Sequence, residues 1–187
     1  MKKILIATLF ALVSAAPAFA DSFASMSYRF EDPVGGAANR QGYQVNFGTD
    51  VVKGLKADVF SESLFTDGNG ANQTRLELGL TPSVDFNYGI TAYARVAAGE
   101  KFIPGDKFAY YSVEPGVKYA VSPALAVKVG YRFRDAFDPT ANADLTRTWK
   151  LGAEYSVSKT QAVIFGIDRA RGDSDYTGAN VGYLVRF

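Results

Sequence analysis

The chain has 187 residues, with 20 Lys and Arg, 19 Asp and Glu, and neither Cys nor His. The absence of Cys excludes a disulfide framework and thiolate sites, and the absence of His removes the commonest neutral-pH base and metal ligand. A net charge of +1 argues against nucleic acid or an anionic membrane surface as the partner. We expect neither a cofactor nor a metal site.

The first twenty residues have the pattern of a secretory signal. Two lysines precede an apolar run over residues 4–13, and the sequence Ala-Phe-Ala at 18–20 supplies the small residues that signal peptidase requires. The run is too short for a transmembrane helix. We expect a Sec-type signal peptide at 1–20, cleavage before Asp21 and one mature domain at 21–187. Loss of the two lysines reduces the 20 basic residues to 18 against 19 acidic ones, a net charge of −1.

The mature chain alternates apolar and polar residues nearly from end to end, which is typical of β-strands with two different faces. The alternating segments are, in chain order, 24–30, 43–48, 55–60, 75–80, 86–96, 109–121, 125–133, 149–157, 163–167 and 181–187. About 17 residues per strand and connection fits a tilted strand of about ten residues that crosses a membrane. We predict ten strands, with eight or twelve as alternatives. The alternation is weakest over 163–167, where Ala162 and Ile164 blur it.

Turn-forming and polar residues separate these segments. Short turns are predicted at 52–54, 82–83, 122–124 and 158–160, and longer loops near 32–41, 66–72, 99–107, 135–146 and 170–178. Ten antiparallel strands with both termini at one end need four connections at that end and five at the other. In outer-membrane barrels the short turns face the periplasm and the long loops face outside.

The charged residues within the strands fall on the row opposite the apolar one. A soluble β-sandwich with a hydrated outer face has the same pattern, so other features must distinguish it from a sheet that spans a membrane. Aromatic residues flank the apolar rows near the strand ends, as in the girdles at lipid–water interfaces. Glycines such as Gly79, Gly130 and Gly166 share the charged row, where they relieve crowding inside a small barrel. The last strand is apolar on one face and ends in Phe187.

These features favour a sheet that spans a membrane. In hydrocarbon each unpaired backbone N–H or C=O costs several kcal/mol, so a spanning sheet must close on itself. We therefore predict an all-β, closed antiparallel transmembrane β-barrel in which the first strand pairs with the last.

The chain resembles the Gram-negative outer-membrane β-barrel proteins over its whole length. The resemblance rests on the signal, the alternating strands, the short turns and the C-terminal pattern of Tyr183, Val185 and Phe187. It implies location in the outer membrane, contact with its lipid and lipopolysaccharide, and recognition of those three residues by the barrel-assembly machinery. The segments 27–30 (Ser-Tyr-Arg-Phe) and 129–133 (Val-Gly-Tyr-Arg-Phe) are similar to strands of small monomeric porins, including those that pass acidic oligosaccharides.

The charges expected to face the interior divide into two groups. The mainly basic group consists of Arg95, Lys118, Lys128, Arg132, Arg134 and Lys150. The mainly acidic group consists of Asp50, Asp58, Glu62 and Glu77. On opposite walls of a water-filled lumen, the two groups would create a transverse field that orients polar solutes and modestly favours anions. The guanidinium groups of Arg132 and Arg134 suit bidentate binding of a carboxylate or phosphate.

We predict a monomeric, porin-like barrel for passive passage of small hydrophilic solutes. The competing hypothesis is a non-conducting structural or surface-interaction barrel, whose inward charges pair across the lumen because unpaired buried charges are costly. An enzyme is not predicted, because membrane-barrel hydrolases commonly use a His base. Residues 67–72 resemble the start of a calcium loop but lack the later bidentate Glu, so we interpret them as a hairpin turn.

Overall fold

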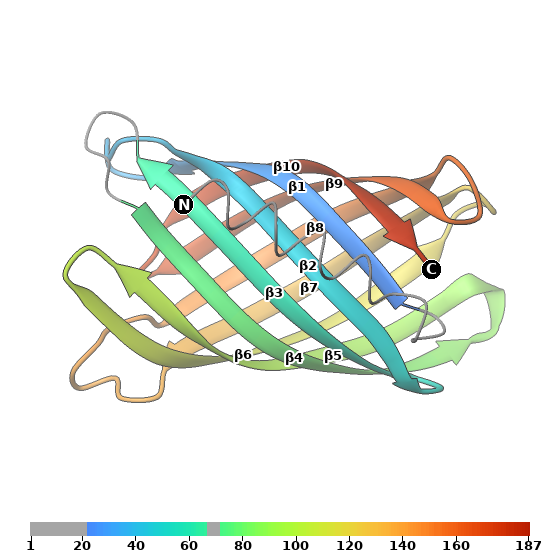
Figure 1. Ribbon diagram of the computed structural model, residues 1–187, viewed down its shortest axis with the longest axis horizontal. Coiled ribbons are helices and arrows are strands. Elements are labelled where there is room, and N and C mark those ends of the chain that lie inside the picture. Colours follow the sequence, from blue (N-terminus) through green and yellow to red (C-terminus); the bar gives the residue numbers. More distant parts are fainter. Residues whose placement is uncertain (1–21, 67–71) are drawn as a thin grey trace.

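A computed structural model describes residues 22–66 and 72–187. They form ten strands that tilt against the long axis of a closed antiparallel barrel (Figure 1). The strands are β1 (Ser22–Pro33), β2 (Arg40–Val52), β3 (Leu55–Thr66), β4 (Asn72–Phe86), β5 (Ile90–Ile103), β6 (Asp106–Ala120), β7 (Leu125–Ala136), β8 (Thr146–Ser156), β9 (Gln161–Gly172) and β10 (Tyr176–Arg186). A 3-10 turn, η2 (Asn87–Gly89), joins β4 to β5. The expected signal peptide at 1–20 lies outside the described residues, as does most of the expected hairpin turn at 67–72.

The barrel closes through the pairing of β1 with β10. Their register runs from Phe23 opposite Arg186 to Pro33 opposite Tyr176, so each strand has a partner on both sides. Hydrocarbon requires this closure, because a free strand edge would leave backbone groups unpaired. The prediction of ten strands in a closed antiparallel barrel is confirmed. Within the described ranges, helical residues form no segment of the length and hydropathy that a membrane-spanning helix needs.

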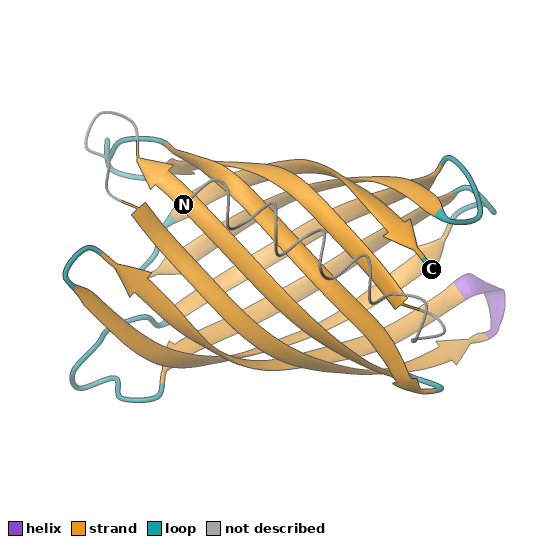
Figure 2. Ribbon diagram, in the orientation of Figure 1, coloured by secondary structure: helices purple, strands orange, loops and turns teal. Residues whose placement is uncertain are grey.

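The two ends of the barrel carry different connections (Figure 2). Ser22 and Phe187 lie at one end, where the Phe187 N–H donates to the Ser22 carbonyl oxygen at 2.9 Å. The connections at this turn end are 53–54, 87–89, 121–124 and 157–160. The opposite end, the loop end, carries 34–39, the connection between β3 and β4, 104–105, 137–145 and 173–175.

The turn predicted at 82–83 is wrong. Pro82 lies within β4, and the chain reverses at η2, where Tyr88 (φ 66°) and Gly89 (φ 74°) adopt left-handed conformations. The register between β4 and β5 skips Thr81 and Pro82. This irregularity tolerates proline, because a residue without an N–H donor loses no ladder hydrogen bond there.

Two of the loops predicted to be long are short. The strand β5 continues to Ile103 and β6 begins at Asp106, so only Pro104 and Gly105 connect them. Gly105 has a φ of 81°, which the third position of a type II turn requires, and proline favours the second position. The connection 173–175 is also short. Polarity alone therefore does not distinguish a loop from the hydrated end of a strand.

The two faces of the barrel wall differ as predicted. The outward Leu78 is 66% exposed, whereas its inward neighbour Glu77 is buried. Gly79 also faces inward, and a Cβ atom there would lie 2.6 Å from Asp58 Oδ1 and 2.7 Å from Arg95 Nε. The glycine therefore leaves the space in which an aspartate and an arginine from two different strands meet.

Candidate functional site

The barrel interior contains a cavity of about 1170 Å³, lined by residues of all ten strands. The cavity begins at the turn end beside Lys53 and extends to Arg134 and Tyr176 in the loop-end half. Nine of the ten charged residues predicted to face the lumen line it, and the tenth, Asp58, is ion-paired to the lining residue Arg95. The lumen is therefore the candidate site.

A first group of ion pairs fills part of the loop-end half. Arg29 of β1 donates two hydrogen bonds of 2.8 Å to Asp168 of β9, and its Nε lies 2.9 Å from Glu31 and 3.4 Å from Glu62. Arg75 of β4 donates from Nε to Glu62 at 2.9 Å. All five side chains are nearly fully buried. The group links strands on both sides of the β1–β10 closure.

A second group is centred on Glu77, whose side chain has no exposed surface. Arg95 Nη1 lies 2.7 Å from Glu77, Arg132 also contacts this carboxylate, and the Tyr110 hydroxyl donates to it at 2.8 Å. Arg95 is in turn 2.6 Å from Asp58. One carboxylate thus joins β4, β5, β6 and β7 from within the lumen.

A third group involves the connection between β7 and β8. Asp144 of this loop lies 2.6 Å from Arg134 Nε and 2.8 Å from Lys101 Nζ. Burial opposes ionisation of Asp144, but the charges of Arg134 and Lys101 outweigh it and hold the pKa of this carboxyl below its ordinary value. The Leu145 N–H, next in the chain, donates to Asp173 at 2.7 Å. The loop is therefore anchored both inside the lumen and at its rim.

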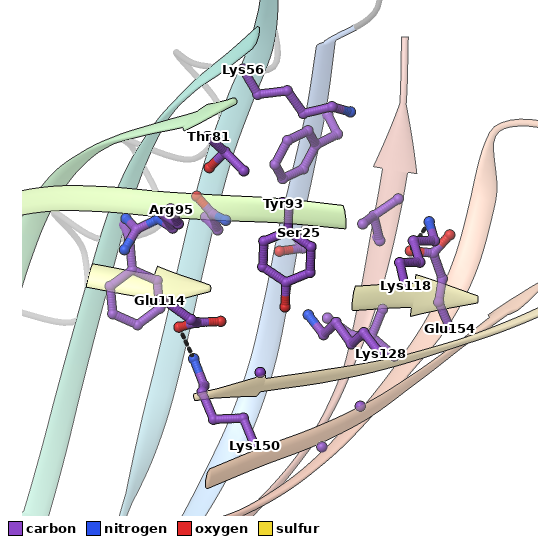
Figure 3. A pocket seen from close by; sticks show the side chains of 18 of the residues that line it. Ser25, Lys56, Thr81, Tyr93, Arg95, Glu114, Lys118, Lys128, Lys150 and Glu154 are labelled. Carbon is purple, nitrogen blue, oxygen red and sulfur yellow. Dashed lines mark hydrogen bonds and ion pairs between the residues drawn. The ribbon is translucent and has the colours of Figure 1, made fainter. Parts of the chain in front are cut away.

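The turn-end half of the lumen is less buried and more basic, and Figure 3 shows Lys118, Lys128 and Lys150 there. The basic patch consists of Lys118, Lys128, Lys150 and Arg186. Lys150 Nζ donates to Glu114 at 2.7 Å, whereas Lys118 and Arg186 share Glu154. Lys128 lies opposite Lys118 in the register and forms no ion pair with a described residue. The patch therefore has four cations for two carboxylates.

The residues selected from the sequence occupy different environments. Lys118, Lys128 and Lys150 share the basic patch, whereas Arg95, Arg132 and Arg134 lie deeper, each against a carboxylate. The acidic residues are also paired: Asp58, Glu62 and Glu77 with arginines, and Asp50 with Lys56 at 3.3 Å. The ion-pair groups contain residues that the sequence-based selection did not include, namely Arg29, Glu31, Arg75, Lys101, Asp144 and Asp168.

The three C-terminal residues of the expected assembly signal lie on β10 and just beyond it. Tyr183 and Phe187 face outward and are exposed, and Val185 is opposite Ala24 of β1. Their outward row therefore continues the apolar surface of the barrel at the turn end.

Comparison with solved structures finds other outer-membrane proteins. An outer-membrane channel from Pseudomonas putida F1 is similar with a TM-score of 0.55 and 7% identity, over 90% of this chain and 96% of that one. The KdgM porin gives a TM-score of 0.46 and 13% identity, over 87% and 99% of the two chains. Neisserial surface protein A gives a TM-score of 0.45 and 13% identity, over 89% of this chain and 96% of that one. At such identities the similarity to the P. putida channel shows the fold alone.

Sequence comparison is more specific. No curated protein has a matching sequence, but a family model described as Gram-negative porin matches residues 7–175. This match covers most of the chain and includes β1 to β9. With the closed barrel and the polar lumen described above, the match shows that the chain belongs to the Gram-negative porin family, whose members are non-enzymatic β-barrels of the outer membrane.

Proposed function

We propose that this porin passes small hydrophilic solutes passively across the outer membrane, with a modest preference for anions. The observation that carries the proposal is the polar cavity of about 1170 Å³, which extends from the turn end to the ion-pair groups of the loop-end half. Such a cavity can hold water and small solutes, because charged side chains line it from Lys53 at the turn end to Arg134 in the loop-end half.

The preference for anions follows from the basic patch. Lys118 and Arg186 share one carboxylate, and Lys128 has none, so the patch carries excess positive charge. The exposed fractions of the Lys118 and Lys150 side chains are 43% and 37%, which leaves their ammonium groups accessible to a solute. A charged ring in a pore raises the local concentration of the opposite ion.

The narrow part of the proposed path is formed by side chains. The side chains of Glu77, Arg95 and Arg132 meet in the lumen. The wall around them consists of hydrogen-bonded strands. Passage past this point requires only that side chains move within the lumen, which takes place far faster than any opening of the wall. We therefore expect a small conductance with frequent closures.

Planar-bilayer recording of the refolded protein tests this function. We expect discrete openings and, under a KCl gradient, a reversal potential that indicates anion preference. The triple variant Lys118→Gln, Lys128→Gln, Lys150→Gln should shift the reversal potential toward that of a cation-preferring pore. The control Lys159→Gln removes one positive charge from a turn outside the cavity lining and should not shift the reversal potential. Openings whose selectivity is the same in the triple variant contradict the proposed role of the patch.

The second candidate is a non-conducting structural barrel. The buried ion pairs around Arg29, Glu62 and Glu77 favour it, because they occupy the lumen between the cavity and the loop end. Folded wild-type protein that stays silent in the bilayer, together with a silent Arg132→Ala variant, would support this candidate and refute the channel. For either function we propose a monomer, inserted by the barrel-assembly machinery through recognition of Tyr183, Val185 and Phe187.

A further inference from the structure

Three arginines lie on the outer surface of the barrel near the loop end, on the adjacent strands β8 and β9. Arg147, Arg169 and Arg171 alternate along these strands with buried, inward residues such as Thr148 and Ala170, so their side chains point away from the lumen. Arg147 and Arg171 are direct partners in the register. Two like charges directly opposite each other in a sheet are destabilising. This pair therefore needs a source of negative charge.

The described part of the protein does not supply that charge. Arg169 is ion-paired to Asp175 at 2.6 Å, but Arg147 and Arg171 form no ion pair with any residue in 22–66 or 72–187. The Asp173 carboxylate accepts a hydrogen bond from the Leu145 N–H and forms no ion pair with either arginine. On β5 and β6, by contrast, the outward Lys107 has a carboxylate partner, since it lies 3.4 Å from Glu100. On β8 and β9 the facing pair Arg147 and Arg171 has none among the described residues.

Neighbouring side chains indicate the depth of this pair in the membrane. Trp149 is the partner of Arg169, is 62% exposed, and packs edge-to-face on Tyr131 at a centroid distance of 4.9 Å. Outward Trp and Tyr mark the headgroup level of an outer-membrane barrel. Arg147 and Arg171 are each two residues, about 7 Å, further toward the loop end. Because the loop end faces outside, they lie at the level of outer-leaflet headgroups.

We infer that Arg147, Arg169 and Arg171 form a binding site for the phosphate groups of a phosphorylated glycolipid in the outer leaflet. A guanidinium group donates in a planar fork that matches two phosphate oxygens. A phosphate between Arg147 and Arg171 neutralises the like-charge pair. Below the arginines, the outward Leu151 and Ile167 are partners in the register and provide an apolar surface for acyl chains. Charge and hydrophobicity therefore both fit a lipid, whereas a soluble phosphate would use the arginines alone.

Native mass spectrometry of the refolded barrel in detergent tests the site. The probe is lipid A with two phosphates, compared with the same lipid after removal of both phosphates. We expect the double variant Arg147→Gln, Arg171→Gln to bind the phosphorylated lipid about tenfold more weakly than wild type. The double variant Lys107→Gln, Lys159→Gln loses the same charge elsewhere and should bind as wild type does. Heat-modifiable migration on gels verifies that every variant is folded.

The other outcomes overturn the inference. If the double arginine variant binds the phosphorylated lipid as tightly as wild type does, the arginines do not form the site. If wild type binds the dephosphorylated lipid as tightly as the phosphorylated one, the phosphate groups are not recognised. Inorganic pyrophosphate that displaces the lipid at equal concentration would identify a site for a soluble anion. A second measurement tests the repulsion between the two arginines. In the absence of phosphorylated lipid, Arg147→Gln should be at least as heat-stable as wild type. In its presence, Arg147→Gln should be less heat-stable than wild type. The reverse order contradicts the argument from the like-charge pair. These readouts do not depend on whether the lumen conducts.

Discussion

The carboxylate of Asp144, in the connection between β7 and β8, lies 2.6 Å from Nε of Arg134, a lumen-facing residue of β7. Lys101 of β5 contacts the same carboxylate. A loop residue thus joins two walls of the lumen at its loop end. The Asp144 carboxylate therefore holds residues 137–145 from inside the lumen, in addition to the hydrogen bond between Leu145 and Asp173 at the rim.

Substitution of Asp144 should release this loop. In Asp144→Asn, the charges of Arg134 and Lys101 lose the anion between them and repel each other, so we expect faster hydrogen exchange over 137–145 and larger single-channel conductance at neutral pH. Asp138→Asn is the control in the same loop, because the exposed Asp138 carboxylate accepts hydrogen bonds from Thr140 and Ala141 within the loop and forms no ion pair with a described residue. Exchange over 137–145 that is equally slow in Asp144→Asn and wild type contradicts this anchoring role.

Acid should have a similar effect to this substitution. The pKa of Asp144 is lowered in the folded protein, so its ionised form stabilises the fold above the ordinary Asp pKa of about 4, and this contribution disappears as the pH falls further. Between about pH 5 and about pH 3, wild type should lose more thermal stability than Asp144→Asn, which has no such group to protonate. Heat-modifiable gel migration across this range measures the difference. Parallel losses in the two proteins would exclude a contribution from this carboxyl.

Glu77 and Glu154 should differ strongly in their effect on stability. Glu77→Gln leaves Arg95 and Arg132 buried without their shared carboxylate, so we expect it to lower the free energy of unfolding by about 3–5 kcal/mol. The Glu154 side chain is 23% exposed, and Glu154→Gln should cost about 1 kcal/mol or less. Urea unfolding in liposomes compares them. Similar costs would mean that the Glu77 network is as accessible to water as the basic patch.

At the middle of the membrane the outward row should tolerate apolar residues only. Leu78 lies in the middle of β4 and points out, so Leu78→Arg places a charge in hydrocarbon and should cost about 2–4 kcal/mol. Val34, an equally apolar and exposed residue, lies in a loop, and Val34→Arg should change stability little. The same urea titration in liposomes applies. A negligible cost at Leu78 would place this part of the wall in water.

The strands were predictable because lipid and lumen impose opposite chemistry on alternate residues. This constraint acts on each residue of the spanning wall, so it is visible in a local window of sequence. At the barrel ends both faces meet water and the constraint vanishes. For this reason Pro82 resembled a turn although it lies in β4, and the polar residues of 99–107 resembled a loop although Pro104 and Gly105 alone connect the strands.

The lumen was predictable in composition and less so in pairing. The inward parity of Glu77 and Arg95 can be read from the alternation, but their contact depends on strand register and on the space above Gly79. Asp144 gave no periodic signal, because a loop has no alternation. The whole-chain charge near neutrality likewise concealed the unbalanced arginines Arg147 and Arg171, since charge at one membrane depth does not appear in a sum.

The ion-pair network around Glu77, Arg95 and Arg132 is made of side chains alone, inside a wall held by backbone hydrogen bonds. The ion-pair network and the backbone that carries it are therefore distinct parts of this molecule. A substitution in the network changes the charge and the space inside the lumen without removing a backbone hydrogen bond of the wall, and it reduces stability where it leaves a buried charge without its partner.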